Sequence, residues 1–193
     1  MNDTKQKLIH ITRQMIDQQG IDGISMRELG KEMNLSRSAM YRHFKNKEDL
    51  LAAIVAENFE MLTSNIREIT ENINDSRKLI YAILYAYFDF GIKNQEHYHL
   101  MFRKQWDKEL YPDLYYSAFG IFKLVEQCLE KAGNLRKSPT QSTAIMYAFI
   151  HGLVDLNLSQ HAETEKGLDN PVYLIESFLD LIFIQGTSKN STL

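Results

Sequence analysis

The sequence has one cysteine and no apolar run long enough to span a bilayer. Its one cysteine, Cys128, excludes an internal disulfide and a thiolate zinc cluster. Its longest uninterrupted apolar run, Leu79–Phe88, has ten residues, whereas a membrane-spanning helix needs about 20. The N-terminal stretch is polar and lacks the apolar core of a signal peptide. We therefore expect a cytoplasmic protein with no membrane partner.

The chain has only three prolines, and each stands where a helix is expected to begin. Pro139 follows Ser138 and Pro171 follows Asn170, the pattern of a capping residue and a proline at the first helical position. The apolar period is helical throughout, and no stretch alternates as a strand does. The sequence predicts an all-α fold with nine helices. The expected helices are 4–19, 26–33, 37–43, 47–70, 76–93, 96–106, 112–132, 139–161 and 171–185.

Charge is unevenly distributed along the 193 residues. The net charge is −3, but residues 1–50 carry +2 and residues 51–193 carry −5. A basic head on an acidic body indicates that the two parts meet different partners. The helices before residue 50 are also short and the later ones long. We expect a head domain at 1–50, with a three-helix, helix-turn-helix layout, and a helical bundle at 51–193.

Residues 25–35 have the features of a short helix followed by a tight turn. Ser25 and Glu28 form the Ser-x-x-Glu pattern of a capping box. Gly30 has no side chain, so another helix can approach it closely. Asn34 is one of the few non-glycine residues that tolerate the left-handed conformation of a tight turn. This spacing predicts the first half of a helix-turn-helix.

The second helix of the motif is capped by Ser36 and turns Met40 and Phe44 inward. A helix of eight residues is about 12 Å long, which matches the width of the major groove of DNA. The same pattern also fits a structural three-helix cap whose basic residues are merely solvated. The outward face of this helix carries Arg37, Ser38, Ala39, Tyr41, Arg42 and His43.

The chemistry of these residues suits a nucleic acid. Arg37 and Arg42 can bond guanine edges or phosphates, and Tyr41 can reach a phosphate oxygen or a thymine methyl group. Asn46 caps the next helix, and Lys47 stands at its start, where backbone N–H groups already favour a phosphate. These residues make the head a candidate for binding double-stranded DNA, with the structural three-helix cap as the open alternative.

Residues 4–50 resemble the DNA-binding domain of the TetR family of bacterial transcriptional regulators. The resemblance is carried, in order and spacing, by GIDGISMRELGKEMNLSRSAMYRHFKNKEDLL. Asn34 stands where the family usually has glycine, and Ala39 where it often has threonine. The hydroxyl contact expected at position 39 is therefore lost.

The resemblance implies a repressor that binds an inverted-repeat operator as a homodimer. It also implies a small-molecule effector that moves the fourth helix as a lever and releases the DNA. No enzymatic activity and no cofactor are implied. Together, the residue pattern and the resemblance predict these DNA contacts: Ser25, Arg27, Ser36, Arg37, Ser38, Tyr41, Arg42, His43 and Lys47.

The bundle is rich in aromatic side chains, which suit both a core and a ligand cavity. The segments HYHLMFRKQ and AFIHGLVDL resemble a C-terminal type found in part of the same family, in which a His-Gly pair lies in the penultimate helix. For each single aromatic residue, plain core packing remains the alternative to a place in the pocket. The candidate ligand contacts are Tyr85, Phe88, Met101, Phe102, Trp106, Tyr116, Phe119, Tyr147, His151 and Asp155.

The last two helices carry more apolar surface than a lone surface helix should expose, which indicates a homodimer. In the family these two helices pair with their copies in a second subunit. The candidate interface residues are Phe149, Gly152, Leu156, Phe178, Leu181 and Ile182.

No motif indicates a metal site or a catalytic site. His97 and His99 are two residues apart, so on a helix they point about 200° apart and cannot share a metal. His151 and Asp155 are spaced to form a buried polar pair, or His151 is an ordinary core histidine. The chain has no P-loop, no Gly-x-Gly-x-x-Gly and no nucleophile elbow. A helical carrier or enzyme with a structural head, and a helical adaptor, remain the alternative functions.

Overall fold

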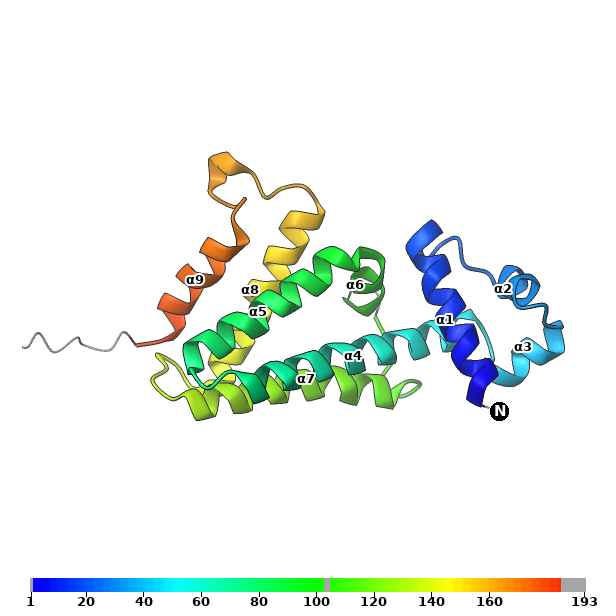
Figure 1. Cartoon of the computed structure of the whole chain (residues 1–193), viewed down its shortest axis with the longest axis horizontal. Helices are drawn as coiled ribbons and strands as arrows, with labels where there is room; N and C mark the ends of the chain where they lie inside the picture. Colours follow the sequence, from blue (N-terminus) through cyan, green and yellow to red (C-terminus); the bar gives the residue numbers. More distant parts are fainter. Residues whose placement is uncertain (1, 103–104, 185–193) are drawn as a thin grey trace, which may run out of the picture. The chain divides into compact units, whose positions relative to one another are not determined.

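The computed structural model describes residues 2–102 and 105–184, and nearly all regular structure in these ranges is α-helical (Figure 1). The one β-type contact among them is an isolated antiparallel bridge between Leu135 and Phe183. The expected all-α fold is confirmed. The elements are α1 (Asn2–Gln19), α2 (Met26–Glu32), α3 (Arg37–His43), α4 (Lys47–Asn72), α5 (Ser76–Lys93), α6 (Gln95–Phe102), α7 (Pro112–Ala132), α8 (Pro139–Leu158), the 3-10 turn η1 (Thr164–Lys166) and α9 (Pro171–Ile182).

Side-chain caps start the helices where the sequence places them. Ser36 Oγ accepts the N–H of Ala39 at 3.2 Å at the start of α3. Ser138 Oγ accepts the N–H of Gln141 at 3.3 Å, and Pro139 follows it at the first position of α8. At α4 and α9, Asn46 and Asn170 accept in the same way. Each cap pairs an N–H group that would otherwise have no partner in its helix.

Four helices end earlier than the sequence predicts, α2 at Glu32 and α9 at Ile182, and α6 and α8 as follows. α8 stops at Leu158, not 161, because Gln160 takes a left-handed φ of +60° and the N–H of His161 turns back to the carbonyl of Leu156 at 2.8 Å. α6 stops at Phe102, and the indole N–H of Trp106 donates to the carbonyl of Leu100 at 3.0 Å, so the predicted extension to 106 is wrong. The predicted last residue of the ninth helix, 185, lies outside the described residues.

The helices form two compact units. Unit 1 comprises Met1–Thr63 and Lys93–Phe119, and unit 2 comprises Ser64–Ile92 and Gly120–Leu193. Unit 1 holds α1, α2, α3 and α6, with the first part of α4. Unit 2 holds most of α5 and α7, with α8 and α9. Among the described residues, no helix is both long and apolar enough to span a bilayer.

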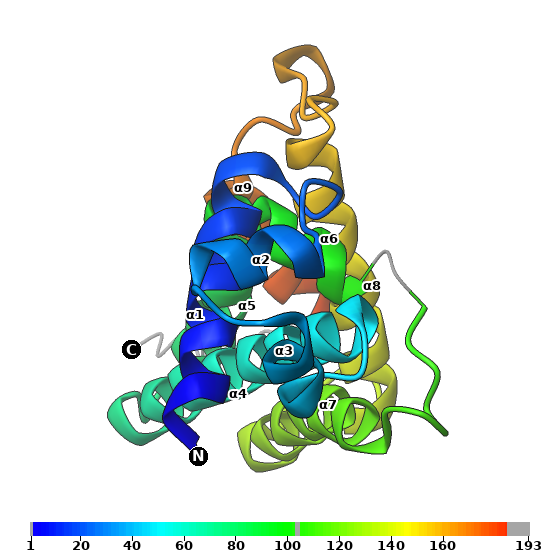
Figure 2. The ribbon, with the colours of Figure 1, turned by 90° about the vertical axis from the view of Figure 1, so that its right-hand side faces the viewer.

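The core of unit 1 lies between α1, α4 and the short helices. In Figures 1 and 2, α2 and α3 lie on the same side of α1. Leu8 and Ile16 of α1, Leu29 of α2 and Ile54 of α4 are fully buried. This apolar packing holds the short helices, which would not be stable alone in water.

The core of unit 2 is formed by apolar side chains of α5, α8 and α9. The rings of Phe149 and Phe178 stack with centroids 4.1 Å apart and link α8 to α9. At the start of α5, the guanidinium of Arg77 lies 3.2 Å from a carboxylate oxygen of Glu176 and 3.0 Å from one of Asp180 on α9. α9 is therefore held on two sides.

The turn between α2 and α3 generates a testable prediction about stability. Asn34 has a φ of +51°, which alanine tolerates less well than asparagine. Asn34→Ala should lower the free energy of unfolding by about 1 kcal/mol, whereas Asn34→Gly should change it by no more than about 0.5 kcal/mol. Urea unfolding followed by circular dichroism measures both values, and equal losses for the two variants would contradict the assignment of strain to this residue.

Candidate nucleic-acid interface

The close approach of α2 and α3 depends on Gly30. A Cβ atom added there would lie 3.3 Å from the carbonyl oxygen of Leu35 and 3.5 Å from Cγ of Met40. The N–H of Leu35 donates to the carbonyl of Gly30 at 2.8 Å and closes the turn. The left-handed Asn34 makes this turn possible. The role that the sequence assigned to Gly30 is confirmed by this geometry.

The inward face of α3 is apolar and its outward face is polar. Met40 and Phe44 are buried, as the sequence predicts. Opposite them, the guanidinium of Arg37 lies 5.5 Å from the ring centre of Tyr41, whose exposed fraction is 42%. This cation–π contact holds two DNA-binding candidates side by side in water. Ser38 and Arg42 are also exposed, and His43 is half-buried.

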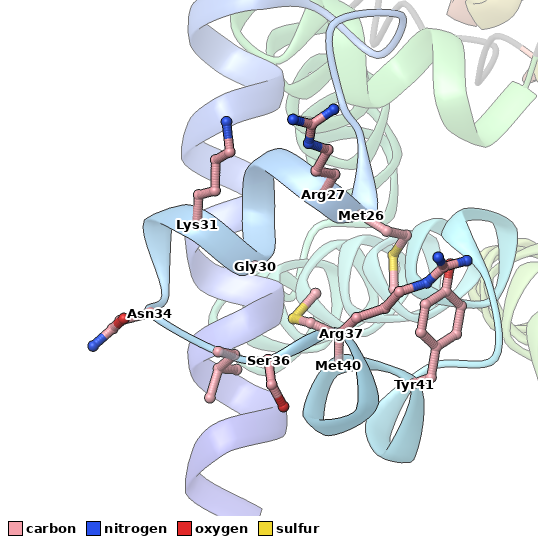
Figure 3. A pocket seen from close by; sticks show the side chains of 10 residues that line it. Met26, Arg27, Gly30, Lys31, Asn34, Ser36, Arg37, Met40 and Tyr41 are labelled. Atoms are coloured by element: carbon pink, nitrogen blue, oxygen red, sulfur yellow. The ribbon is translucent and has the colours of Figure 1, made fainter.

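A hollow of about 640 Å³ lies between α2 and α3. Figure 3 shows Arg27 and Lys31 extending from α2, and Arg37 and Tyr41 extending from α3. Three cationic side chains around one hollow suit an anionic partner such as a phosphate backbone. Lys31 was missed by the sequence reasoning, although its position four residues after Arg27 places both on one face of α2.

The hydroxyl of Ser25 serves the start of α2. It accepts the N–H of Glu28 at 3.1 Å and donates to the Glu28 carboxylate at 3.0 Å. The half of the capping box in which Ser25 caps the helix is therefore formed, and the Glu28 carboxylate accepts from the hydroxyl of Ser25. A contact from this hydroxyl to DNA would have to be made alongside these two bonds.

Lys47 is placed differently from the other basic candidates. Its ammonium group donates to the backbone carbonyl of Ile21 at 2.9 Å, and the side chain is half-buried. Lys47 thus joins the start of α4 to the loop that follows α1. Because 26 residues separate the two groups, no local pattern in the sequence reveals this bond.

The candidate ligand contacts are divided between the two units. Those in unit 1 are packed against neighbours or exposed: Phe102 meets the ring of Phe59 edge-on with centroids 5.7 Å apart, and Met101 is buried. The unit 1 members are Met101, Phe102, Trp106, Tyr116 and Phe119, and the unit 2 members are Tyr85, Phe88, Tyr147, His151 and Asp155.

In unit 2 the histidine of the His-Gly pair lies among aromatic rings. His151 Nε2 is 2.9 Å from the hydroxyl of Tyr87 on α5, and the ring centroid of Tyr147 is 4.3 Å from that of the imidazole. Burial lowers the pKa of His151 to about 4, although the charge of Asp155 acts in the opposite direction. Asp155 itself is exposed, so of the two alternatives for His151 the buried pair with Asp155 is wrong. The hydroxyl of Tyr87 is a hydrogen-bond partner of the imidazole.

The candidate interface residues of α8 and α9 differ in exposure. Phe178 and Ile182 are buried within the chain, whereas Leu181 has an exposed fraction of 71%. Phe149 and Leu156 are half-buried, and Gly152 is exposed. The sequence reasoning did not single out the exposed apolar residues Val172 and Tyr173 on α9.

His97 and His99 lie on α6, and His97 is bonded to protein groups on both nitrogens. Its Nδ1 is 3.2 Å from Asn58 Nδ2, and its Nε2 is 3.2 Å from a carboxylate oxygen of Asp17. In the part of the chain that the structure describes, no three histidine, cysteine or acidic side chains are grouped as metal ligands.

Known proteins resemble both parts of the chain. Residues 8–54 match the family described as bacterial regulatory proteins, tetR family, and residues 80–173 match the tetracyclin repressor-like C-terminal domain. An uncharacterized HTH-type transcriptional regulator of Bacillus subtilis, YobS, is 26% identical over 186 residues, which cover 94% of this chain and 93% of YobS.

Two solved structures share the fold over most of their length. A TetR-family transcriptional regulator from Pectobacterium atrosepticum has a TM-score of 0.75 at 17% identity, with 96% of each chain covered. A protein of unknown function from Rhodococcus sp. RHA1 has a TM-score of 0.76 at 21% identity, with 90% of each chain covered.

The half-buried imidazole of His151 in unit 2 generates a prediction about pH. In the folded protein His151 should titrate near pH 4, so it stays neutral at pH values where an unfolded chain already binds a proton. As the pH falls from 6.5 towards 4, the free energy of unfolding should therefore decrease. NMR titration of the imidazole, assigned with His151→Gln, measures the pKa, and a midpoint near 6.5 would refute the burial of this group.

Proposed function

The chain belongs to the TetR family of bacterial transcriptional regulators, and on this premise we propose that it is a repressor released from DNA by a small molecule. In this proposal two copies bind an inverted-repeat operator. The observation that carries it is the outward face of α3, where Arg37 and Tyr41 stand exposed over a buried Met40. The homologues and the fold indicate a regulatory DNA-binding protein, and we propose no enzymatic role.

The recognition step uses α3 in the major groove. Arg37 and Arg42 are the candidates for base edges, because guanidinium groups bond guanine in a bidentate way. Tyr41, Arg27 and Lys31 surround the hollow between α2 and α3 and are the candidates for phosphates. Contacts to phosphates position the protein on the DNA and make its affinity depend on the salt concentration.

The two copies are proposed to meet through α8 and α9. Leu181, Val172 and Tyr173 of α9 and Ile145 of α8 are apolar and exposed in the single chain. Burying such residues against a twofold copy would remove them from water. A dimer would place two recognition helices on half-sites about 34 Å apart, or one helical turn of DNA.

The effector is proposed to bind in unit 2 near His151. A neutral imidazole beside the hydroxyl of Tyr87 and the ring of Tyr147 offers hydrogen bonds and an aromatic surface without a net charge. This supports an uncharged, aromatic or apolar effector with a polar group. Binding of effector and of DNA would oppose each other by the same factor, because such coupling is reciprocal.

Loss of the Tyr41 side chain tests the DNA interface. Tyr41→Ala should weaken operator binding at least about tenfold, because it removes one contact and the ring that holds Arg37. The operator is recovered by selecting bound fragments from host genomic DNA. Affinity is then measured by gel shift at matched salt concentrations.

Arg67→Ala serves as the matched control, because Arg67 is an exposed cation of α4 in unit 2. It should leave operator affinity within about twofold of the wild type. Circular dichroism should show both variants folded. Unchanged affinity in Tyr41→Ala would refute the assignment of α3 as the recognition helix.

The proposed dimer has an equally direct test. Leu181→Glu should shift the protein from dimer to monomer, because a carboxylate cannot be buried unpaired in an apolar interface. Leu110→Glu is the control: Leu110 and Leu181 each have an exposed fraction of 71%, but Leu110 lies in unit 1. Analytical ultracentrifugation measures the mass, and a Leu181→Glu protein that remains dimeric would exclude this surface.

A further inference from the structure

Two buried polar side chains lie where α1, α4 and α6 meet in unit 1. Asn58 of α4 has an exposed fraction of 0% and His97 of α6 one of 2%. Arg13 Nη1 donates to Asn58 Oδ1 at 2.6 Å, Asn58 Nδ2 lies 3.2 Å from His97 Nδ1, and His97 Nε2 lies 3.2 Å from Asp17. The four side chains form a continuous relay that leaves α1 at Arg13 and returns to it at Asp17.

The relay allows only one arrangement of protons. A guanidinium can only donate, so the Asn58 atom that faces Arg13 is the carbonyl oxygen. The amide NH₂ group of Asn58 then faces His97, and because NH₂ only donates, His97 Nδ1 must accept. The imidazole proton is therefore on Nε2, where it is donated to the Asp17 carboxylate. Arg13 thus fixes the tautomer of a histidine that it does not touch.

A second proton on His97 would break this pattern. Protonated Nδ1 would face the NH₂ group of Asn58, and two donors would point at each other. The charged groups around the ring are Arg13 and Asp17 of α1, Glu96 of α6 and, beyond Arg13, Glu57 of α4. Burial and the charge of Arg13 lower the pKa of His97, although the two nearby carboxylates act in the opposite direction.

Two further contacts lie at the C-terminal end of α1. Gly20 has a φ of +74°, and a Cβ there would be 3.3 Å from a carboxylate oxygen of Glu96, so α1 ends close against α6. The carbonyl of Ile21 accepts from Lys47 at 2.9 Å, at the start of α4. The relay is therefore the polar part of a larger junction between α1 and the two helices beneath it.

We propose that Asn58 is a positioning residue for DNA binding, holding α1 against α4 and α6 only while His97 is neutral. Because α1 packs against α2 in the head, release of α1 would disturb the surface that carries the recognition helix. The protein would thus bind its operator less tightly in acid. This inference rests on the proposed function for its DNA readout but not for its geometry.

The sign of the pH effect follows from the proton count. We call α1 attached when the relay is formed and released when it is broken. His97 is neutral in the attached state but can bind a proton in the released state. Attachment is therefore favoured above pH 6.5 and is lost progressively below it. Between pH 7.5 and 5.8 the ratio of attached to released α1 should fall by up to about fivefold. The operator dissociation constant should rise over the same range, by a factor of at most about five.

The decisive variant is Asn58→Asp, which has nearly the same shape. A carboxylate accepts from Arg13 as before, but it also presents an acceptor to His97 Nδ1, so the protonated imidazole now fits. In this variant operator affinity should stay constant or increase as the pH falls from 7.5 to 5.8. Asn65→Asp is the control, because it adds the same charge to α4 at an exposed position and should keep the wild-type pH profile.

Affinity is measured by gel shift at both pH values, with circular dichroism confirming the fold, and His97 is followed by NMR in the free protein. Every other histidine, including His43 in α3, is present in all three proteins, so the difference between their pH profiles belongs to the relay. The proposal requires a neutral His97 with its proton on Nε2 at pH 7.5, and a raised pKa in Asn58→Asp.

Parallel pH profiles for wild type and Asn58→Asp would overturn the positioning role. A His97 that carries its proton on Nδ1 at pH 7.5 would overturn the relay itself. Failure of all three folded proteins to bind any genomic fragment would overturn the proposed function and the DNA-positioning role with it, while the NMR result would still decide whether the relay exists.

Discussion

The packing of the helix-turn-helix depends on Gly30, which has no side chain. Because Gly30 has no Cβ atom, the Leu35 carbonyl oxygen and Met40 Cγ can come within 3.3 and 3.5 Å of the point where one would lie, and α3 packs closely on α2. Met40 and Phe44 then occupy the inner face, and four side chains of α3 are exposed on the outer one: Arg37, Ser38, Tyr41 and Arg42. An alanine at position 30 would require the carbonyl of Leu35 to move away by a few tenths of an ångström, which would loosen the turn between the two helices.

The second constraint is polar and lies beneath the head. Asn58 and His97 are both buried, and each would be costly to bury without partners. Their partners on α1 are Arg13 and Asp17, whose side chains remain partly open to water. Asn58 and His97 are therefore shielded from water, whereas Arg13 and Asp17 are partly exposed to it. Such a contact is directional, since it is stable only when the donors and acceptors of three helices are aligned.

Much of the fold was predictable because its signals are local. Capping residues, prolines at first helical positions and a left-handed asparagine fixed the helix starts and the turn of the motif. The relay was not predictable for a physical reason. Arg13 and Asp17 are four residues apart with opposite charges, a spacing typical of an exposed pair on one helix. Both instead reach across to other helices, and Lys47 likewise bonds a carbonyl 26 residues away. Contacts of this kind exist only once the chain has folded.

The polar character of this junction also explains how it can serve a regulator. Apolar packing tolerates small displacements of a helix with little change in energy, because it has no fixed direction. A hydrogen-bonded amide and imidazole lose their bonds over a displacement of less than 1 Å, since donor and acceptor must stay within about 3.2 Å. Asn58, as the residue that bonds both Arg13 and His97, makes α4 and α6 hold one position of α1 and reject neighbouring ones. If the protein is the ligand-released repressor that we propose, a head that is held in one position can leave the DNA as a unit.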